Sequence, residues 1–374
     1  MKCKYFGSCG SCGLYELSYS EQLEQKLSRV SGLLSPFYSG ELELFDSPDS
    51  HYRARAEFRI WHIGEICSYA MGNITRDGTV CIDECPKVIE PIERRMWGLL
   101  EDINNHKVLA HKLFGIEFLA TTADECLVTM LYHKRLDESW SALALELESR
   151  HNISIIGRSR KQKVVLSKEF VTEVLTVDNR VYTYRYYEGG FTQPNPIANI
   201  SMIEWARGAI GDRPRGDLLE SYCGLGNFTI PLSNLFDKVL ATEISKNSIK
   251  AAKENCELNG VNNIEFVRLS SQEMTEALNR EREFRRLADI ELDSYNFSTV
   301  LVDPPRAGLD SATVELISGI DTIIYISCNP DTLARDLGRL CQTHSVSKAA
   351  IFDQFPHTAH VESGVLLHRK VIDE

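Results

Sequence analysis

The sequence lacks any continuous apolar run of about eighteen residues, the length that a transmembrane helix needs. It also lacks an apolar stretch near its start, where residues 1–10 read MKCKYFGSCG, and this excludes a secretory signal at that position. We therefore expect a cytoplasmic protein without a membrane-spanning segment. Eleven cysteines in that reducing compartment favour a metal site, a cluster or catalysis over disulfide bonds.

Positive charge is scarce in this chain. Its 41 lysines and arginines are outnumbered by 53 acidic residues, which gives a formal net charge of −12. Domains that bind nucleic acid are often basic overall, so this balance argues against such a partner, although it still permits a local basic face. The 374 residues, 43% of them apolar and 25% charged, predict a soluble globular protein of two or three domains.

A dinucleotide-binding fingerprint is incomplete in residues 218–228, LLESYCGLGNF. An apolar strand enters a turn that contains Gly224 and Gly226, and glycines there let the backbone approach a nucleotide-like ligand. The third glycine of the fingerprint is absent, because position 229 is threonine. Glu243 ends the next predicted strand, where an acid can bind ribose hydroxyls. The combination favours S-adenosylmethionine over NAD, and a purely structural turn is the alternative.

No internal repeat is detectable, but from about residue 186 strand and helix patterns alternate. Predicted strands cover residues 217–222, 238–242, 264–268, 298–302, 323–327, 349–352 and 364–368. Predicted helices cover residues 196–210, 245–259, 271–286 and 312–319, with two more that end near residue 235 and begin after Asn329. Repeated strand–helix units predict an α/β fold with a mostly parallel, doubly wound sheet.

The preceding residues 40–185 read as mostly strands with two helices, an α+β region. In residues 52–61, YRARAEFRIW, the apolar side chains alternate with charged ones, which is typical of a strand with one solvated face. Residues 19–34 have helical spacing, with a predicted apolar face of Leu23, Leu27, Val30 and Leu34. We therefore predict a leader of residues 1–14, a central region of residues 15–185 and a C-terminal domain of residues 186–374.

The segment of residues 323–332, IIYISCNPDT, places a cysteine at a predicted strand end. Asn329 can cap the following helix and Pro330 suits its first turn. Open α/β sheets carry their chemistry at the carboxyl ends of strands, so Cys328 is a candidate nucleophile rather than a buried apolar residue. The positive end of the helix is expected to favour its thiolate form.

Two further segments carry acids at strand boundaries. Residues 301–306, LVDPPR, end a predicted strand with Asp303 and a rigid proline pair. Residues 352–367, FDQFPHTAHVESGVLL, place Glu362 just before the last predicted strand. Taken alone, the first could be a simple strand stop and the second a solvated surface charge.

Together these segments make the sequence resemble the RNA uracil-C5 methyltransferases, most closely the branch that makes ribothymidine in the T loop of tRNA. The resemblance covers residues 15–370 and rests on HYRARAEFRIWH, HKLFGIEFL, LYHKRLDESW, FTQPN, REFRRL, VDPPRAGLD, YISCNPDTL and FDQFPHTAHVESGVLL. It implies a C-terminal Rossmann-like S-adenosylmethionine methyltransferase sheet and a central α+β RNA-binding region. It also implies tRNA as the partner.

The resemblance implies a role for each matching residue. Cys328 is the expected nucleophile and Glu362 the expected base. The expected S-adenosylmethionine ligands are Gln193, Tyr222, Asn227, Glu243 and Asp303. The chemistry needs these groups, because thiolate addition at C6 of uracil makes C5 nucleophilic and a base must then remove the C5 proton. The target base must also flip out of the RNA stack.

The leader cysteines depart from the usual bacterial tRNA enzyme, which lacks them. Their C-x5-C-x2-C spacing, with a further cysteine before Pro86, is similar to the cluster of the ribosomal-RNA uracil methyltransferases. That likeness implies a [4Fe–4S] cluster, whereas spacing alone also permits a zinc site. The expected ligands are Cys3, Cys9, Cys12 and Cys85, with Cys81 as the competing fourth ligand. Four other cysteines, Cys67, Cys126, Cys256 and Cys341, are expected to be structural.

For RNA contact we expect two basic patches. One is the strand face with Arg53, Arg55, Arg59 and Trp61, and the other is residues 158–163, RSRKQK. A 23S rRNA uracil-C5 methyltransferase is the alternative in the same class, because the cysteine set belongs to that branch. A non-catalytic, metal-stapled RNA-binding protein and a NAD-dependent oxidoreductase are more distant alternatives.

Overall fold

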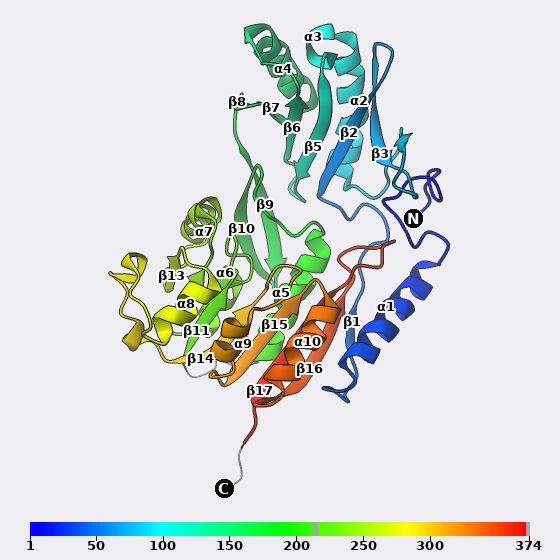
Figure 1. The fold of residues 1–374 in the computed structure, drawn as a ribbon. Helices are drawn as coiled ribbons and strands as arrows, with labels where there is room; N and C mark the ends of the chain where they lie inside the picture. Colours follow the sequence, from blue (N-terminus) through cyan, green and yellow to red (C-terminus); the bar gives the residue numbers. More distant parts are fainter. Residues whose placement is uncertain (212–215, 372–374) are drawn as a thin grey trace.

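The computed structural model describes residues 1–211 and 216–371. Of the predicted domain 186–374, residues 212–215 and 372–374 therefore lie outside the described part. Two sheets dominate the fold, and a two-stranded ribbon lies between them (Figure 1). Within the described ranges, no helix is both long enough and apolar enough to cross a membrane.

The larger sheet has eight strands in the order β1-β16-β17-β15-β14-β11-β12-β13. These strands are β1 (Glu43–Phe45), β11 (Asp217–Ser221), β12 (Val239–Thr242), β13 (Ile264–Val267), β14 (Phe297–Val302), β15 (Thr322–Ser327), β16 (His344–Phe352) and β17 (Glu362–Arg369). All neighbours are parallel except that β17 runs antiparallel to both β15 and β16. Because β17 is antiparallel to its neighbours, its first residue, Glu362, lies at the edge where β14 and β15 end.

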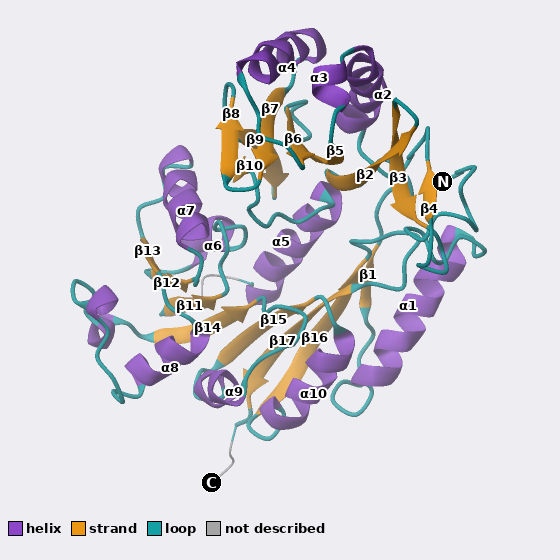
Figure 2. Cartoon of the chain, turned by 45° about the horizontal axis from the view of Figure 1, so that its top comes forward, coloured by secondary structure: helices purple, strands orange, loops and turns teal. Residues whose placement is uncertain are grey.

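Helices cover both faces of this sheet (Figure 2). One face packs against α5 (Pro196–Ile210), α6 (Thr229–Leu232) with η1 (Ser233–Leu235), and α7 (Lys246–Leu258). The other packs against α1 (Tyr19–Leu34), α8 (Ser271–Leu278), α9 (Ser311–Ile317) and α10 (Pro330–Leu340). Successive strand residues such as Leu218 and Leu219 enter opposite cores. The predicted doubly wound α/β fold is confirmed.

The smaller sheet has seven strands in the order β4-β3-β2-β5-β6-β7-β8. They are β2 (Arg55–Ile63), β3 (Ile66–Gly72), β4 (Thr79–Cys81), β5 (Leu113–Ala120), β6 (Cys126–Tyr132), β7 (Ser154–Ser159) and β8 (Gln162–Val165). Helices α2 (Glu90–Asn105), α3 (Lys107–Ala110) and α4 (Glu138–His151) pack on one face of this sheet. As predicted, Ala56, Phe58 and Ile60 are buried on β2, whereas Arg59 and Trp61 are exposed on its other face.

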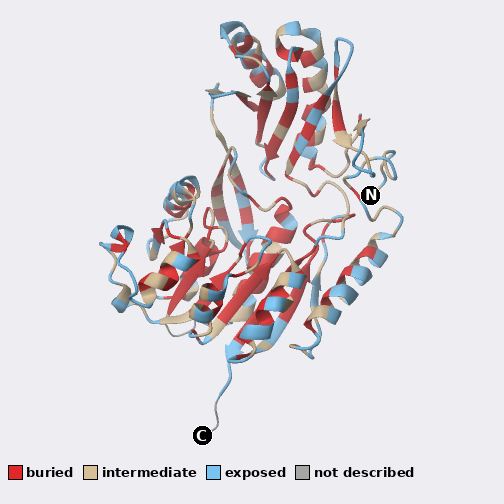
Figure 3. Ribbon diagram, viewed as in Figure 1, coloured by how far each residue is buried: buried red, intermediate tan, exposed pale blue. Residues whose placement is uncertain are grey.

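Three elements of the predicted central region pack against the larger sheet. Strand β1 pairs with β16, and helix α1 contributes Val30 and Leu34 to the core beneath α9 and α10. The ribbon of β9 (Phe170–Val177) and β10 (Arg180–Tyr187) packs its tyrosines against α5 and α7. The larger sheet thus combines a strand from the N-terminal part of the chain with strands from its C-terminal part. Its strands are mostly buried (Figure 3).

Two helices differ from the predictions. The helix predicted over residues 271–286 ends at Leu278, because Asn279 closes it and Arg280 turns to the left-handed region at φ 59°. Residues 285–287 and 292–294 then form the short 3₁₀ turns η2 and η3. In α1 the buried positions are Gln22, Lys26, Val30 and Leu34. Leu23 and Leu27 are only half-buried, so the prediction of the buried face of α1 was wrong at these two positions.

Candidate active site

The carboxyl edge of the larger sheet brings the predicted catalytic residues together. Strand β15 ends at Ser327, which pairs with Ser363 on β17. Cys328 follows Ser327 on the chain and Glu362 precedes Ser363. Because the two strands are antiparallel, this register places Cys328 beside Glu362. Asp303 follows the end of neighbouring β14 and interacts electrostatically with both. Three segments far apart in sequence therefore meet at one point.

The local sequence fixes the Cys328 backbone as predicted. Asn329 is the N-cap of α10, and its side chain accepts a hydrogen bond from the Asp331 backbone N–H at 3.2 Å. Pro330 occupies the first turn of the helix. The Asn329 amide also donates to the Arg306 carbonyl at 3.1 Å, which joins the cysteine turn to the LVDPPR loop.

The electrostatics of Cys328 differ from the prediction. Burial, Glu362 and Asp303 together raise the pKa of its thiol to about 11, and Arg306 lowers it by less than these raise it. The net effect of these surroundings is therefore opposite to the thiolate that the helix end was expected to favour. A half-buried thiol beside two carboxyls is neutral at physiological pH.

The carboxyls at this edge are shifted in the same direction. Burial is the main cause, and it raises the pKa of Glu362 well above its ordinary value and that of Asp303 to about 7. A third acid, Glu220 on β11, was not singled out from the sequence. Burial and the nearby Asp303 raise its pKa to about 8, and its Oε2 has no hydrogen-bond partner among the described residues. A buried carboxyl on a core strand gives no sequence signal that separates it from a surface acid.

A pocket beside this edge collects four of the five predicted cofactor ligands, namely Gln193, Tyr222, Asn227 and Asp303. The fifth, Glu243, is adjacent: its Oε2 accepts from the Gly224 backbone N–H at 3.2 Å and its Oε1 from that of Ser245 at 2.7 Å. This carboxylate therefore ties the glycine turn to the end of β12. The arrangement can hold a ligand with a nucleoside at the turn and a reactive group near Asp303.

The turn itself is unusual at Tyr222, which has a left-handed φ of 65° although it is not glycine. Its hydroxyl accepts a hydrogen bond from Ser271 at the start of α8, and this contact fixes the ring against the pocket. Asn227 exchanges a pair of amide hydrogen bonds with Asn199 of α5, at 2.9 and 2.8 Å. Residues on two helices thus hold the pocket wall in place.

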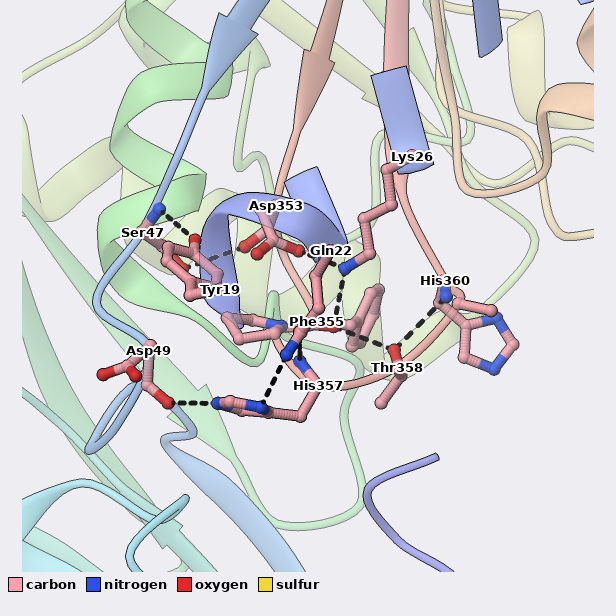
Figure 4. A network of polar contacts seen from close by, with 12 residues as sticks. Tyr19, Gln22, Lys26, Ser47, Asp49, Asp353, Phe355, His357, Thr358 and His360 are labelled. Atoms are coloured by element: carbon pink, nitrogen blue, oxygen red, sulfur yellow. Dashed lines mark hydrogen bonds and ion pairs between the residues drawn. The ribbon is translucent and has the colours of Figure 1, made fainter. Parts of the chain in front are cut away.

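The loop that leads to Glu362 is anchored by α1 (Figure 4). Lys26 donates to Asp353 Oδ1 at 2.6 Å and to the Phe355 carbonyl at 3.1 Å, and both charged side chains are at most 3% exposed. The His357 ring donates from Nε2 to the Asp49 carbonyl and accepts from Gln22 at Nδ1. Burial, aided by nearby positive charges, lowers the pKa of His357 to about 4, so it is neutral in this network.

Comparison with known proteins places this geometry in a family. The family model for tRNA (uracil-5-)-methyltransferase matches residues 18–370, nearly the whole chain. The chain belongs to that family. A "tRNA/tmRNA (uracil-C(5))-methyltransferase" of Sulfurovum sp. is 68% identical over 99% of this chain and 100% of its own length. A protein of the same name from Nitratiruptor sp. is 55% identical over 99% of this chain and 100% of its own.

A solved structure has the same fold. It is the Pyrococcus abyssi tRNA (uracil-54, C5)-methyltransferase in complex with S-adenosyl-L-homocysteine, with a TM-score of 0.72 and 24% identity. The similarity covers 96% of this chain and 85% of that one. The similarity therefore extends over both the Rossmann-like sheet and the smaller α+β part of this family member.

The leader cysteines of this family member also converge. Cys3, Cys9, Cys12 and Cys85 line one cavity of about 40 Å³ between the leader and the β4–α2 connection, whereas Cys81 does not line it. Among residues 1–211 and 216–371, however, no three His, Cys, Asp or Glu side chains are placed to hold a metal ion. The thiols share a cavity without forming a ready metal centre. Cys67, Cys126 and Cys256 are buried elsewhere, and Cys341 is half-buried.

Of the two predicted RNA patches, the second lines a groove. A cavity of about 770 Å³ is bordered by Phe114, residues 131–135 and residues 158–162, and the Phe114 and His133 rings stack at 4.0 Å. Arg158 is held in this family member by two bonds to Glu188. On the first patch, Arg55 donates to the Gly190 carbonyl at 2.5 Å and is partly buried. The exposed cations are therefore fewer than the sequence pattern indicated.

Proposed function

We propose that this protein transfers a methyl group from S-adenosylmethionine to C5 of a T-loop uridine in tRNA. The main support for the proposal is the position of Cys328 beside Glu362, where β15 ends and the antiparallel β17 begins. Family membership and the names of the 68% and 55% identical relatives support the reaction class and the RNA substrate. Those names include tmRNA, which we include as a second substrate.

In this proposal Cys328 is the nucleophile. Its thiol loses its proton to solvent, the sulfur adds to C6 of the flipped uracil, and C5 of the resulting enolate takes up the methyl group. Glu362, as the carboxylate, then accepts the C5 proton, and elimination of the Cys328 thiolate restores the ring. Burial raises the pKa of Glu362, which makes its carboxylate a stronger base once it is ionised. S-adenosylmethionine supplies the methyl group.

The binding roles rest on the pocket beside β11. Gln193, Tyr222, Asn227, Glu243 and Asp303 are proposed to hold S-adenosylmethionine, because four of them line the pocket and Glu243 is bonded to its glycine turn. Buried carboxyls near a cationic ligand lose their protons more readily. The positive charge of the bound ligand is thus expected to favour the ionised forms of Asp303, Glu362 and Cys328 directly, because it opposes the mutual raising of their pKa values.

The RNA is proposed to lie across the smaller sheet. The groove beside Phe114 and His133 offers a stacked ring pair, and Arg160 and Lys161 at its rim form no ion pair with any described residue. Stacking on exposed bases and cationic contact with phosphates are the usual means of holding single-stranded RNA loops. Residues 15–185 are proposed to contain the RNA-binding region, on the smaller sheet, and residues 186–374 the methyltransferase domain, whose sheet also includes β1 from the first range.

The leader is proposed to carry a [4Fe–4S] cluster on Cys3, Cys9, Cys12 and Cys85, with zinc as the alternative. Four cysteines around one cavity are the donor set that either group requires, and their convergence from the leader and the β4–α2 connection supports the fit. The proposed role of this group is structural, because the group would join the leader to the smaller sheet.

The test is tritium release from RNA labelled at uracil C5, with tRNA, tmRNA and 23S rRNA compared in parallel. Wild-type protein should release tritium from tRNA, whereas Cys328→Ala should release none and form no covalent adduct. Cys341→Ala, which changes a half-buried cysteine on the same helix, should behave as wild type. Turnover by Cys328→Ala would remove the nucleophile assignment, and release from rRNA alone would replace tRNA as the substrate.

A further inference from the structure

A buried glutamine behind the candidate cofactor pocket has no role so far. Gln354 lies in the loop before β17 and is fully buried, at 0% exposure. Its Nε2 donates to Gln193 Oε1 at 2.8 Å, and Gln193 is one of the residues that line the pocket. The Gln354 Oε1 atom has no hydrogen-bond partner among the described residues. A buried amide with an unsatisfied carbonyl costs stability, so its retention calls for an explanation.

The second contact of the Gln354 amide favours the same orientation. The same Nε2 lies 3.7 Å from the sulfur of Met202 on α5. A thioether sulfur is a weak acceptor, so a donor group is the better neighbour for it than a carbonyl. Met202 therefore supports the orientation in which Gln354 donates to Gln193.

The consequence falls on Gln193. Its carbonyl oxygen is occupied by Gln354, so its NH₂ group is the end that remains available. That nitrogen makes no hydrogen bond to any other described residue, and the side chain is only partly buried at the pocket wall. An amide in this orientation turns its NH₂ donors, rather than its carbonyl, toward the ligand.

We propose that Gln354 is a positioning residue which fixes the Gln193 amide so that the pocket offers a donor to a ligand oxygen. The proposal deepens the proposed methyltransferase function and rests on it for the identity of the ligands. The matching chemistry is a carbonyl or carboxylate oxygen, which both substrates supply: the amino-acid carboxylate of S-adenosylmethionine and the carbonyls of uracil. Cytosine carries an amine in place of the uracil O4, and this donor surface would disfavour it.

The loop backbone makes the positioning rigid. The Asp353 N–H donates to the Phe45 carbonyl of β1 at 2.9 Å, and the Ser47 hydroxyl donates to the Asp353 carbonyl at 3.0 Å. Gln354 therefore extends from a backbone that is held on both sides of the preceding residue. A rigid support is what allows one side chain to select the rotamer of another.

The experiment is a double-mutant cycle between Gln354 and Gln193. Gln354→Met keeps the side-chain length and removes the donor, and Gln354→Leu is a second variant in case the first folds poorly. Either should lower kcat/KM for tRNA about tenfold, the effect of one hydrogen bond to a charged or strongly polar group. In a Gln193→Ala background the same change should have no further effect. The exposed Gln342→Leu is the matched control, and melting temperatures report on folding.

Two binding measurements identify the ligand oxygen. Weaker binding of S-adenosylhomocysteine in calorimetry, with normal adduct formation on 5-fluorouridine RNA, would assign it to the cofactor carboxylate. Normal calorimetry with slower adduct formation would assign it to the uracil carbonyl. Unchanged results in both, or losses that multiply in the double mutant, would overturn the positioning role. If wild-type protein methylates no RNA, the proposed function fails, and the calorimetric cycle still tests the orientation of Gln193.

Discussion

At the scale of single residues, the main feature is a proposed nucleophile, Cys328, whose surroundings oppose its ionisation. The pKa of Cys328 is raised to about 11, chiefly by burial and then by Glu362 and Asp303. At pH 7 about one molecule in ten thousand would carry the thiolate. Reactivity must therefore be generated in the complex, because a cation near Asp303 and Glu362 offsets the charge that holds the proton on sulfur.

Alkylation of Cys328 by iodoacetamide should consequently rise about tenfold for each pH unit and level off only near pH 11. Mass spectrometry of the peptide that contains Cys328 measures the rate. A cationic analogue such as sinefungin should shift the profile to lower pH, whereas neutral S-adenosylhomocysteine should shift it less. A profile centred near pH 8.5 without ligand would contradict the raised pKa.

Glu362→Gln should separate the two halves of the proposed reaction. Adduct formation and methyl transfer should survive, because Cys328 is intact, but the product should stay attached since no group accepts the C5 proton. Denaturing gels should show methylated RNA bound to protein. Glu315→Gln, an exposed change on α9, is the control and should release product normally. Release at the wild-type rate by Glu362→Gln would assign the base elsewhere.

The sequence indicated Cys328 locally, because a strand end and a helix cap can be recognised from neighbouring residues, whereas Glu362 was expected only from the family resemblance. It did not contain the direction in which the Cys328 pKa moves, which depends first on burial in the folded protein and then on the nearby Glu362 and Asp303. Gln354 and Glu220 were also missed, since each is an ordinary polar residue whose role arises from contacts across the sheet.

At the scale of elements, helix α1 and the loop before β17 form one unit. The apolar pattern of α1 predicted a face with Leu23 and Leu27, but Gln22 and Lys26 are buried instead. A hydrophobic period cannot reveal this, because their burial depends on His357 and Asp353 from the far end of the chain. The α/β succession was easier to predict, since each strand and helix there is defined by its own residues.

Lys26→Met should lower the free energy of unfolding by about 3 kcal/mol, because it leaves the Asp353 carboxylate buried without its cation. Urea titration measures the change. The double variant Lys26→Met/Asp353→Leu should recover most of it, since neither charge then remains. Lys107→Met, which breaks a fully exposed pair with Glu65, should leave the stability unchanged. Equal effects of Lys26→Met and Lys107→Met would refute the importance of the buried pair.

At the scale of the whole molecule, the leader connects the two sheets. The Gly10 N–H donates to the Gly72 carbonyl of the β3–β4 hairpin, and the Leu14 N–H donates to the carbonyl of His357. One short segment therefore contacts both the smaller sheet and the loop that precedes Glu362. The proposed metal group at its cysteines would add a further link between the leader and the smaller sheet.

Protein purified without oxygen should contain iron and labile sulfide in near-equal amounts and absorb broadly in the visible range. Cys3→Ser and Cys85→Ser should lose both, whereas Cys81→Ser is the matched control and should keep them, because Cys81 does not line the cavity. Loss of the group should weaken RNA binding more than S-adenosylhomocysteine binding, since the Gly224 turn belongs to the other sheet. One equivalent of zinc without sulfide would refute the cluster and favour the zinc alternative.

The ion pair between Lys26 and Asp353 joins positions 327 residues apart. During synthesis on the ribosome, α1 emerges long before Asp353. The Lys26 amine can therefore form its buried ion pair only after the chain as far as Asp353 has been made. The loop before Glu362 must therefore be among the last segments to settle, whatever else has folded earlier. The segment that precedes the proposed base can thus take its final place only after the chain has been synthesised beyond Asp353.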